Sequence, residues 1–249
     1  HGMLDQALAG LPPGSRVLEL GCGTAIDSCL LAGRHPEHVF FGVDIASGSL
    51  ALARRAGAQT SQRLLLARGD AFRLPFRPGS FSLIFHQGLV EHFPAPEGTM
   101  RELARLLAPG GWAVISAPQA FTGYTVMKRL RILRGTWPWG WERSYTAGAL
   151  MALGRGAGLG PRGRAAEGYW RSWFEPAWVL RDLYRKAHRR NPWGGRAPFP
   201  ALHRAWERLW EGIEGRFGHL FCKNVIVCFR KPPGGEGEAP PQCGSGRAA

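Results

Sequence analysis

The sequence predicts an α/β fold in which helices flank a parallel β-sheet. Three observations in the first 118 residues support this prediction. Short apolar runs of strand length alternate with helical stretches, a glycine-rich turn links the first run to the first helix, and an aspartate ends the second run. A chain that alternates strands and helices builds a parallel sheet, because each helix carries the chain back to start the next strand.

Apolar runs and helical stretches in this part give the expected elements. Strands are expected at 17–20, 39–43, 64–66, 81–85 and 112–116. Helices are expected at 25–33, 48–57 and 96–107. The last of these helices is expected to end at Pro109-Gly110-Gly111, because proline and glycine commonly follow a helix C-terminus.

After Pro118 the alternation is less regular. Helical periodicity is found at 146–158, 176–190 and 200–217, and a candidate strand at 163–169. Val225, Val227 and Phe229 alternate with their neighbours as in a strand, so a final strand is expected at about 221–230. We expect a single domain over 1–231 and a disordered Pro/Gly-rich tail over 232–249.

Charge and tryptophan are unevenly distributed along the chain. Residues 1–118 contain ten arginines and nine acidic residues, a net charge of +1, whereas residues 119–249 contain 22 basic and nine acidic residues, a net charge of +13. Nine of the ten tryptophans also lie in the second part, Trp112 being the exception. A near-neutral N-terminal module is thus followed by a basic, aromatic C-terminal one.

Composition also limits the class of protein. No stretch approaches the roughly 18–20 apolar residues of a membrane-spanning helix. The opening His1-Gly2-Met3 looks like the edge of a fragment, and no signal-peptide pattern follows it. The five cysteines lack zinc-type spacing, and their odd number favours free thiols, so a reduced, cytoplasmic protein is expected.

The strongest motif is Val17-Leu18-Glu19-Leu20-Gly21-Cys22-Gly23-Thr24-Ala25, where the first strand meets the first helix. Glycines at such a junction let the backbone turn tightly and approach a ligand closely. A dinucleotide-binding loop would have a third glycine where this chain has Ile26, and Glu19 would repel a pyrophosphate. A carboxylate at the strand end suits a ligand that carries an ammonium group instead.

Further motifs follow in a fixed order. Asp44 ends the second strand, where a carboxylate can accept both hydroxyls of a ribose. Asp70 follows the third strand, where a carboxylate can accept an adenine amino group. The fourth strand leads into His86-Gln87-Gly88-Leu89-Val90-Glu91-His92-Phe93, and Leu106-Leu107-Ala108-Pro109-Gly110-Gly111 opens the fifth. In this order, residues 15–118 resemble the cofactor-binding core of the type 11 S-adenosylmethionine-dependent methyltransferases.

The resemblance implies a fold, a cofactor and a set of site residues. The fold would be a Rossmann-like, seven-stranded and mostly parallel sheet flanked by helices, with its last strand antiparallel. The cofactor would be S-adenosylmethionine, leaving S-adenosylhomocysteine as product. Carried over position by position, the cofactor contacts would be Glu19, Gly21, Cys22, Gly23, Asp44, Ile45, Asp70, Ala71, His86 and Gln87. Ala25 replaces a glycine that is frequent in the family.

Two features near the fourth strand have more than one interpretation. His86 could act as general base, since the ordinary pKa of histidine is about 6.5, or it could only line the cofactor pocket or cap the next helix. Glu91-His92 resembles part of a divalent-cation site of some quinone methyltransferases. The matching upstream ligand position is Gly88, however, so we predict no metal.

The segments 119–143 and 170–217 are predicted to be inserts at the substrate side, because both leave the carboxyl ends of strands if the family layout holds. The connection 119–143 is aromatic and basic, and together with the helical segment 170–217 it would form a lid over the substrate. The substrate-lining candidates are His92, Tyr124, Trp170 and Trp173, and further aromatic candidates are Phe121, Trp137, Trp139, Trp141, Tyr169 and Phe174. The alternative is that these aromatic side chains form a small core of the insert itself.

The acceptor of the methyl group remains open between several classes. A small molecule, anionic or lipid- and quinone-like, is ranked first, with peripheral contact to an anionic membrane through basic and tryptophan side chains. RNA is second, because clusters such as 185–190 could bind phosphates, although the base-methylating Asn-Pro-Pro-Tyr is absent after the fourth strand. A non-catalytic binding protein of the same fold is third. The sequence does not indicate the oligomeric state.

Overall fold

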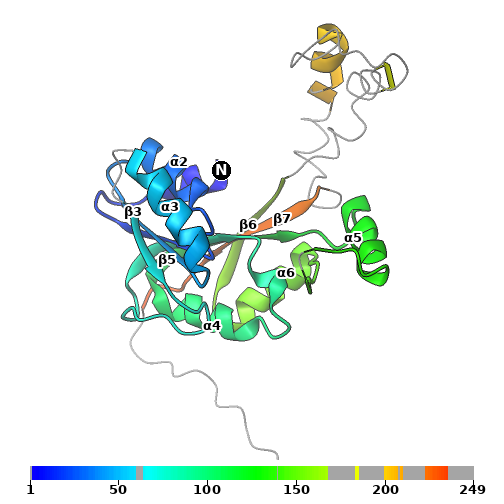
Figure 1. Ribbon diagram of the computed structural model, residues 1–249. Coiled ribbons are helices and arrows are strands. Elements are labelled where there is room, and N and C mark those ends of the chain that lie inside the picture. Colours follow the sequence, from blue (N-terminus) through cyan, green and yellow to red (C-terminus); the bar gives the residue numbers. More distant parts are fainter. Residues whose placement is uncertain are drawn as a thin grey trace, which may run out of the picture.

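A computed structural model of the chain shows a seven-stranded β-sheet flanked by helices (Figure 1). It describes residues 2–59, 64–138, 140–167, 183–184, 199–206, 208–209 and 222–234. The strands are β1 (Arg16–Leu20), β2 (Val39–Asp44), β3 (Leu64–Arg68), β4 (Phe81–Gln87), β5 (Leu107–Pro118), β6 (Gly160–Glu167) and β7 (Asn224–Arg230). Their order in the sheet is β3-β2-β1-β4-β5-β7-β6.

Strand directions agree with the predicted fold class. Strands β1 to β5 pair in parallel, and β7 is antiparallel to both of its neighbours, β5 and β6. The prediction of a mostly parallel sheet with an antiparallel last strand is therefore confirmed. Strand order reverses between β1 and β4, and ligands of such sheets bind outside the carboxyl ends of the strands at this point.

Helices cover both faces of the sheet. They are α1 (Gly2–Ala9), α2 (Ile26–Arg34), α3 (Ser47–Gln59), α4 (Glu97–Leu106), α5 (Gly123–Leu133) and α6 (Ala147–Gly156). Side chains of α1 and α2 share a buried apolar cluster with one face of the sheet, and those of α4 and α6 share the main cluster with the other. Figure 1 shows α2 and α3 together on one side of the sheet, and α4 and α6 on the other.

Two helices and one boundary differ from the sequence prediction. Helix α1 was not predicted, and the connection 119–143 contains α5. Helix α4 ends at Leu106, and β5 begins at once, so Pro109-Gly110-Gly111 lies within the extended segment instead of ending the helix. The register of β4 on β5 shifts between Phe81 and Leu83, because β5 has extra residues between Leu107 and Trp112, the partners of Phe81 and Leu83. Gly110, in this bulge, has a φ angle in the left-handed region.

Much of the predicted second insert and tail lies outside the described residues. Of 170–217, only 183–184, 199–206 and 208–209 are described, and residues 235–249 of the tail are not. Within the described ranges, no helix is both long and apolar enough to cross a membrane.

Candidate active site

The glycine-rich loop after β1 folds back onto the end of β2. The backbone N–H groups of Gly21 and Cys22 both donate to the carbonyl oxygen of Val43, at 2.8 and 3.0 Å. Gly21, Gly23 and Ala25 have φ angles of 68°, 52° and 55°, in the left-handed region. This conformation suits glycine and strains alanine, so Ala25 is the one unfavourable residue of the turn.

The two glycines of the loop serve different purposes. A Cβ built on Gly21 would lie 2.8 Å from Cδ1 of Leu89, so the loop packs tightly against the segment after β4. A Cβ built on Gly23 would meet no atom within 4 Å. The loop is therefore closed toward Leu89 and open at Gly23, where a ligand could approach the backbone. The side chain of Cys22 is buried against Leu50 of α3 and offers no thiol to such a ligand.

Asp44 joins the end of β2 to the glycine-rich loop. Its Oδ2 accepts a hydrogen bond from the Gly23 N–H at 2.7 Å, and its Oδ1 accepts one from the Ala46 N–H at 2.8 Å. Each carboxylate oxygen has lone-pair capacity beyond these bonds, so two further donors can be bound. The neighbouring Ile45 side chain is 63% exposed and offers an apolar surface beside this carboxylate.

Glu19 lies beneath the loop and not on its surface. It is 4% exposed, and its Oε2 accepts hydrogen bonds from both the N–H and the hydroxyl of Ser28, in α2. Burial, aided by the nearby Asp27 and Asp44 carboxylates and opposed by the hydrogen bonds from Ser28, raises the pKa of Glu19 to about 7. Glu19 thus ties α2 to β1, and its predicted contact with an ammonium group stays a prediction.

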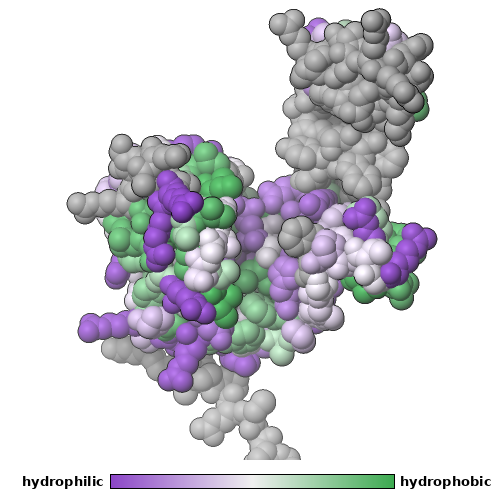
Figure 2. Space-filling model, in the orientation of Figure 1, coloured by the Kyte–Doolittle hydropathy of each residue, from purple (hydrophilic) through white to green (hydrophobic). Residues whose placement is uncertain are grey.

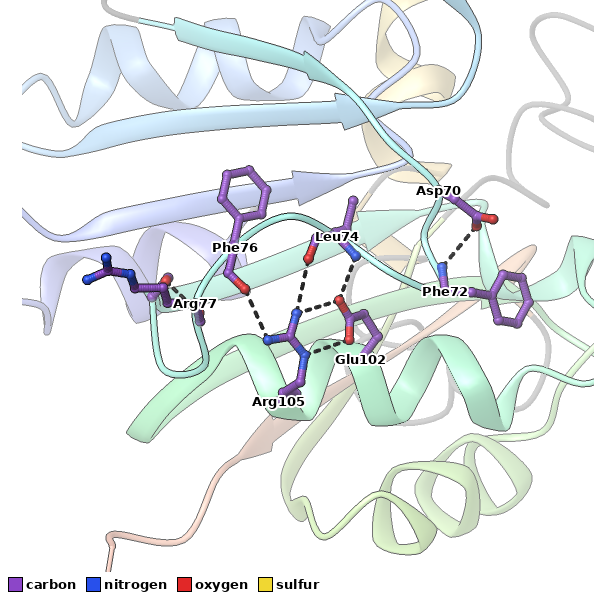
Figure 3. Close-up of polar contacts among 8 residues, drawn as sticks. Asp70, Phe72, Leu74, Phe76, Arg77, Glu102 and Arg105 are labelled. Atoms are coloured by element: carbon purple, nitrogen blue, oxygen red, sulfur yellow. Dashed lines mark hydrogen bonds and ion pairs between the residues drawn. The ribbon is translucent and has the colours of Figure 1, made fainter.

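The loop that carries Asp70 is anchored by an ion pair. Asp70 is exposed, and its Oδ1 accepts a hydrogen bond from the Phe72 N–H at 3.0 Å. Farther along, the Arg105 guanidinium donates twice to the Glu102 carboxylate at 2.7 Å and also to the carbonyls of Phe76 and Leu74 (Figure 3). Glu102 in turn accepts from the Leu74 N–H at 2.7 Å.

These contacts give the Glu102–Arg105 pair a structural role. The Arg105 guanidinium lowers the pKa of Glu102. Because both partners belong to α4 and the accepting carbonyls belong to the loop after β3, the pair fixes that loop on the helix (Figure 3). Asp70 and Ala71 stand at the start of the same loop, where the adenine contact is predicted.

His86 and Gln87 end β4 on opposite faces of the sheet. His86 pairs with Ile115, a residue of the α4/α6 core, whereas Gln87 pairs with Ser116. His86 is fully buried, neither ring nitrogen has a hydrogen-bond partner among the described residues, and burial lowers its pKa to about 4. The role of general base stays a prediction, but the burial of the ring favours a packing role in the core over a catalytic one.

The segment after β4 carries Glu91 and His92 in a 3₁₀ turn (Val90–His92). His92 is exposed, while Glu91 is 3% exposed and its Oε2 has no described hydrogen-bond partner. Burial and the Glu142 carboxylate raise the pKa of Glu91 to about 7, and Lys128 opposes that rise. Among the described residues, no three acidic, histidine or cysteine side chains gather as metal ligands, and the absence of a metal remains a prediction.

The first insert holds an unexpected buried ion pair. Lys128 in α5 is 2% exposed, and its Nζ lies 3.1 Å from Oε2 of Glu142. The ring of Tyr124, a predicted lining residue, is half-buried and packs edge-on to Trp137 at 6.1 Å, with Lys128 and Lys223 Nζ 5.8 and 4.8 Å from its centre. No spacing signal in the sequence marks this cluster as buried.

Other predicted lining residues divide into two groups. Phe121 and Trp141 are described and exposed, at 77% and 51%. Trp139, Tyr169, Trp170, Trp173 and Phe174 lie outside the described residues. Ser28, the partner of Glu19, was also not predicted as a site residue. It lies in the first turn of α2, which begins at Ile26, so its hydroxyl reaches Glu19 in β1.

Known proteins resemble this chain in sequence. A family model described as a methyltransferase domain matches residues 18–115. A ubiquinone biosynthesis O-methyltransferase of Bordetella avium is 32% identical over 166 residues, which cover 64% of this chain and 67% of that protein. A demethylmenaquinone methyltransferase of Thermus thermophilus is 34% identical over 112 residues, covering 45% of this chain and 50% of that one.

A solved structure is similar in fold. Phosphoethanolamine N-methyltransferase 2 of Haemonchus contortus, in complex with S-adenosyl-L-methionine, superposes with a TM-score of 0.59 over 93% of this chain and 51% of that one. The two sequences are 16% identical. This likeness concerns the fold.

Proposed function

We propose, from the premise that this chain belongs to the type 11 S-adenosylmethionine-dependent methyltransferases, that its acceptor is a small molecule of lipid or quinone type. Membership of the family makes the chain a methyltransferase with S-adenosylmethionine as cofactor. The nature of the acceptor is the proposal, and it is supported by the relatives and by the surface of α5.

The residues at the carboxyl edge fit the cofactor. Asp44 has lone pairs for two ribose hydroxyls, and exposed Ile45 offers an apolar surface to adenine. Asp70 keeps an oxygen free of described contacts for an amino group, and the open side of Gly23 lets a ligand reach the loop. These polar and apolar groups match the ribose, ring and amino group of an adenosine. The individual cofactor contacts remain predictions.

Catalysis asks little more of the protein than alignment. The cofactor, when bound, supplies a methyl group already activated by a positively charged sulfur. The residues of the chain therefore have to hold donor and acceptor in line and keep the acceptor near Gln87 at the end of β4. A proton acceptor is needed only where the nucleophile carries a proton.

The relatives point to a quinone-like acceptor. A ubiquinone biosynthesis O-methyltransferase and a demethylmenaquinone methyltransferase are 32% and 34% identical to this chain over their matched regions. These matched regions include the cofactor-binding core that all such enzymes share, so the acceptor needs separate support. The first insert provides it.

Helix α5 presents its apolar side chains to the outside. Val126, Leu130 and Leu133 follow the helical spacing of one stripe and are 59%, 47% and 83% exposed. Arg129 and Arg131 are exposed on the same helix. The end of the molecule formed by α5 carries both apolar and strongly hydrophilic side chains (Figure 2).

This combination suits the surface of an anionic membrane, in which apolar side chains enter the headgroup region and arginines meet phosphates. A lipophilic acceptor is concentrated in such a membrane. We therefore expect α5 to dock on anionic lipid and bring the acceptor to the site.

A methyl-transfer assay tests the acceptor class. Purified protein would be incubated with isotopically labelled S-adenosylmethionine and either a bacterial lipid extract or total RNA, and products would be found by mass spectrometry. We expect labelled methyl groups in a lipid or quinone-precursor fraction. Label in RNA alone would contradict the proposal and favour the RNA methyltransferase alternative.

A vesicle assay tests the docking surface. We expect co-sedimentation with vesicles that contain phosphatidylglycerol and little with pure phosphatidylcholine. Leu133→Gln should weaken binding by at least about threefold, whereas Leu52→Gln on α3, a leucine of 54% exposure, should not change it. Equal effects of the two substitutions would refute docking through α5.

A further inference from the structure

A cavity of about 340 Å³ lies between α1 and the carboxyl-end part of the sheet. Residues of α1 form its roof, and β4, β5, β6 and β7 form its floor and edge. Met3 reaches across β6, since a Cβ built on Gly163 would lie 3.4 Å from its Cε. The volume falls within the range of small-molecule sites, roughly 300–1,000 Å³.

Strand register puts one row of side chains into this cavity. Gln87 of β4 pairs with Ser116 of β5, Ser116 pairs with Ile226 of β7, and Ile226 pairs with Ala165 of β6. Paired residues share a face of the sheet, and Glu167 lies two residues after Ala165 on that face. Consequently Gln87, Ser116 and Glu167 give the cavity a polar side.

The cavity adjoins the cofactor edge. Glu19 of β1 lies opposite Phe85 of β4, so Gly21 and Gln87 follow at the same end of two neighbouring strands. Gln87 is a predicted cofactor contact and also lines the cavity. A molecule in the cavity would thus meet the methyl donor at Gln87.

The polar side of the cavity contains a held carboxylate. The Ser116 hydroxyl, in a residue that is 4% exposed, donates to Oε1 of Glu167 at 3.3 Å. Among the described residues that line the cavity, none is a lysine or arginine. His86 is also a lining residue, but it alternates with Phe85 and Gln87 along β4, so its ring lies on the opposite face of the sheet. A ligand group that donates hydrogen bonds would be favoured here, and an anionic group would be repelled by the carboxylate.

We infer that this cavity binds the acceptor, and that Glu167, positioned by Ser116, selects acceptors whose reacting end is a hydroxyl or amine over those with an anionic end. The rest of the acceptor lies on the apolar floor around Phe85 and Val114. This inference rests on the proposed function, because an acceptor cavity has a use only beside a methyl donor.

Two ring-sized probes test the selectivity without cofactor. Catechol carries hydroxyl donors, and benzoate carries a carboxylate on the same ring. Dissociation constants for both would be measured by ligand-observed NMR with the full chain. We expect the unmodified protein to bind catechol at least about tenfold more tightly than benzoate, and Glu167→Gln to reduce this preference to about threefold or less. Glu97→Gln, an exposed carboxylate on α4, should leave the preference unchanged.

Filling the cavity provides the second arm. Ala165→Phe from β6 and Met3→Trp from α1 should each weaken catechol binding by at least about tenfold. The two variants fill the cavity from different elements, so the test stays valid if one of them fails to fold. An unchanged preference in Glu167→Gln, or unchanged binding in a folded filled variant, would overturn the inference. S-adenosylhomocysteine affinity, measured separately, should stay within about threefold in Glu167→Gln. If the unmodified protein does not bind S-adenosylhomocysteine, this result would instead count against the proposed function.

Discussion

Replacing Glu19 with glutamine should change how stability depends on pH. In the folded protein, burial raises the pKa of this carboxyl from 4.5 to about 7. Below pH 4.5 the carboxyl is protonated in both states. As the pH rises from 4.5 to about 7, the unfolded chain loses this proton first, so the folded state loses stability over this window and keeps the deficit above it.

The size of the effect follows from the two pKa values. At about 1.4 kcal/mol per pH unit, the gap between 4.5 and about 7 corresponds to about 3 kcal/mol. Glutamine can still accept from Ser28 and carries no charge to desolvate. The stability of Glu19→Gln relative to the unmodified protein should therefore rise by about 3 kcal/mol between pH 4.5 and about pH 8.

Urea unfolding at several pH values, followed by tryptophan fluorescence, measures this difference. Any cost of placing the amide is the same at each pH and cancels from the trend. The exposed Glu97→Gln serves as the control for loss of a surface carboxylate, and its difference from the unmodified protein should vary far less than that of Glu19→Gln. If the difference in unfolding free energy between Glu19→Gln and the unmodified protein varies by less than about 1 kcal/mol over this range, the conclusion that burial raises the pKa of Glu19 is wrong.

Three further substitutions test how the fold is held together, each measured as a change in the urea midpoint. Gly154→Ala in α6 should destabilise by about 2 kcal/mol, because its Cβ would lie 2.1 Å from Cε1 of buried Phe229; no loss would refute that packing. Glu142→Gln should cost roughly 3–5 kcal/mol, since it leaves the Lys128 ammonium buried without its partner, whereas replacing both with apolar residues should cost less. Arg105→Lys should cost about 1–3 kcal/mol because an ammonium cannot replace the four donations of the guanidinium; an equal midpoint would show that the loop does not need them.

The cofactor-binding half was predictable because its signals are local. A glycine-rich turn between an apolar run and a helix has few structural solutions, and Gly21 and Gly23 adopt the left-handed angles that the turn requires. Asp44 lies at the strand end where the run stops, so its position follows from the length of β2. What the pattern could not show is that Glu19 is covered, since its partner Ser28 is nine residues away and joined through tertiary contact.

Helix α5 was missed because its pattern is reversed. The apolar stripe of a helix is expected to face the core. In α5 the buried positions are Thr125 and Lys128, while Leu130 and Leu133 are exposed. Nothing in the sequence reveals that Lys128 is satisfied by Glu142, 14 residues later, so the segment resembled an irregular basic connection.

The cofactor site is tested most directly by titrating S-adenosylhomocysteine into the unmodified protein and into Asp44→Ala in a calorimeter. We predict measurable binding to the unmodified protein and a loss of about 1–3 kcal/mol in Asp44→Ala, roughly a 5- to 150-fold weaker affinity, because charge-assisted hydrogen bonds to the ribose disappear. Glu37→Ala, which removes an exposed carboxylate just before β2, at the opposite end of that strand from Asp44, should bind as the unmodified protein does. Equal affinity of Asp44→Ala and the unmodified protein, or binding of NAD as tight as that of S-adenosylhomocysteine, would contradict the cofactor site described for this chain.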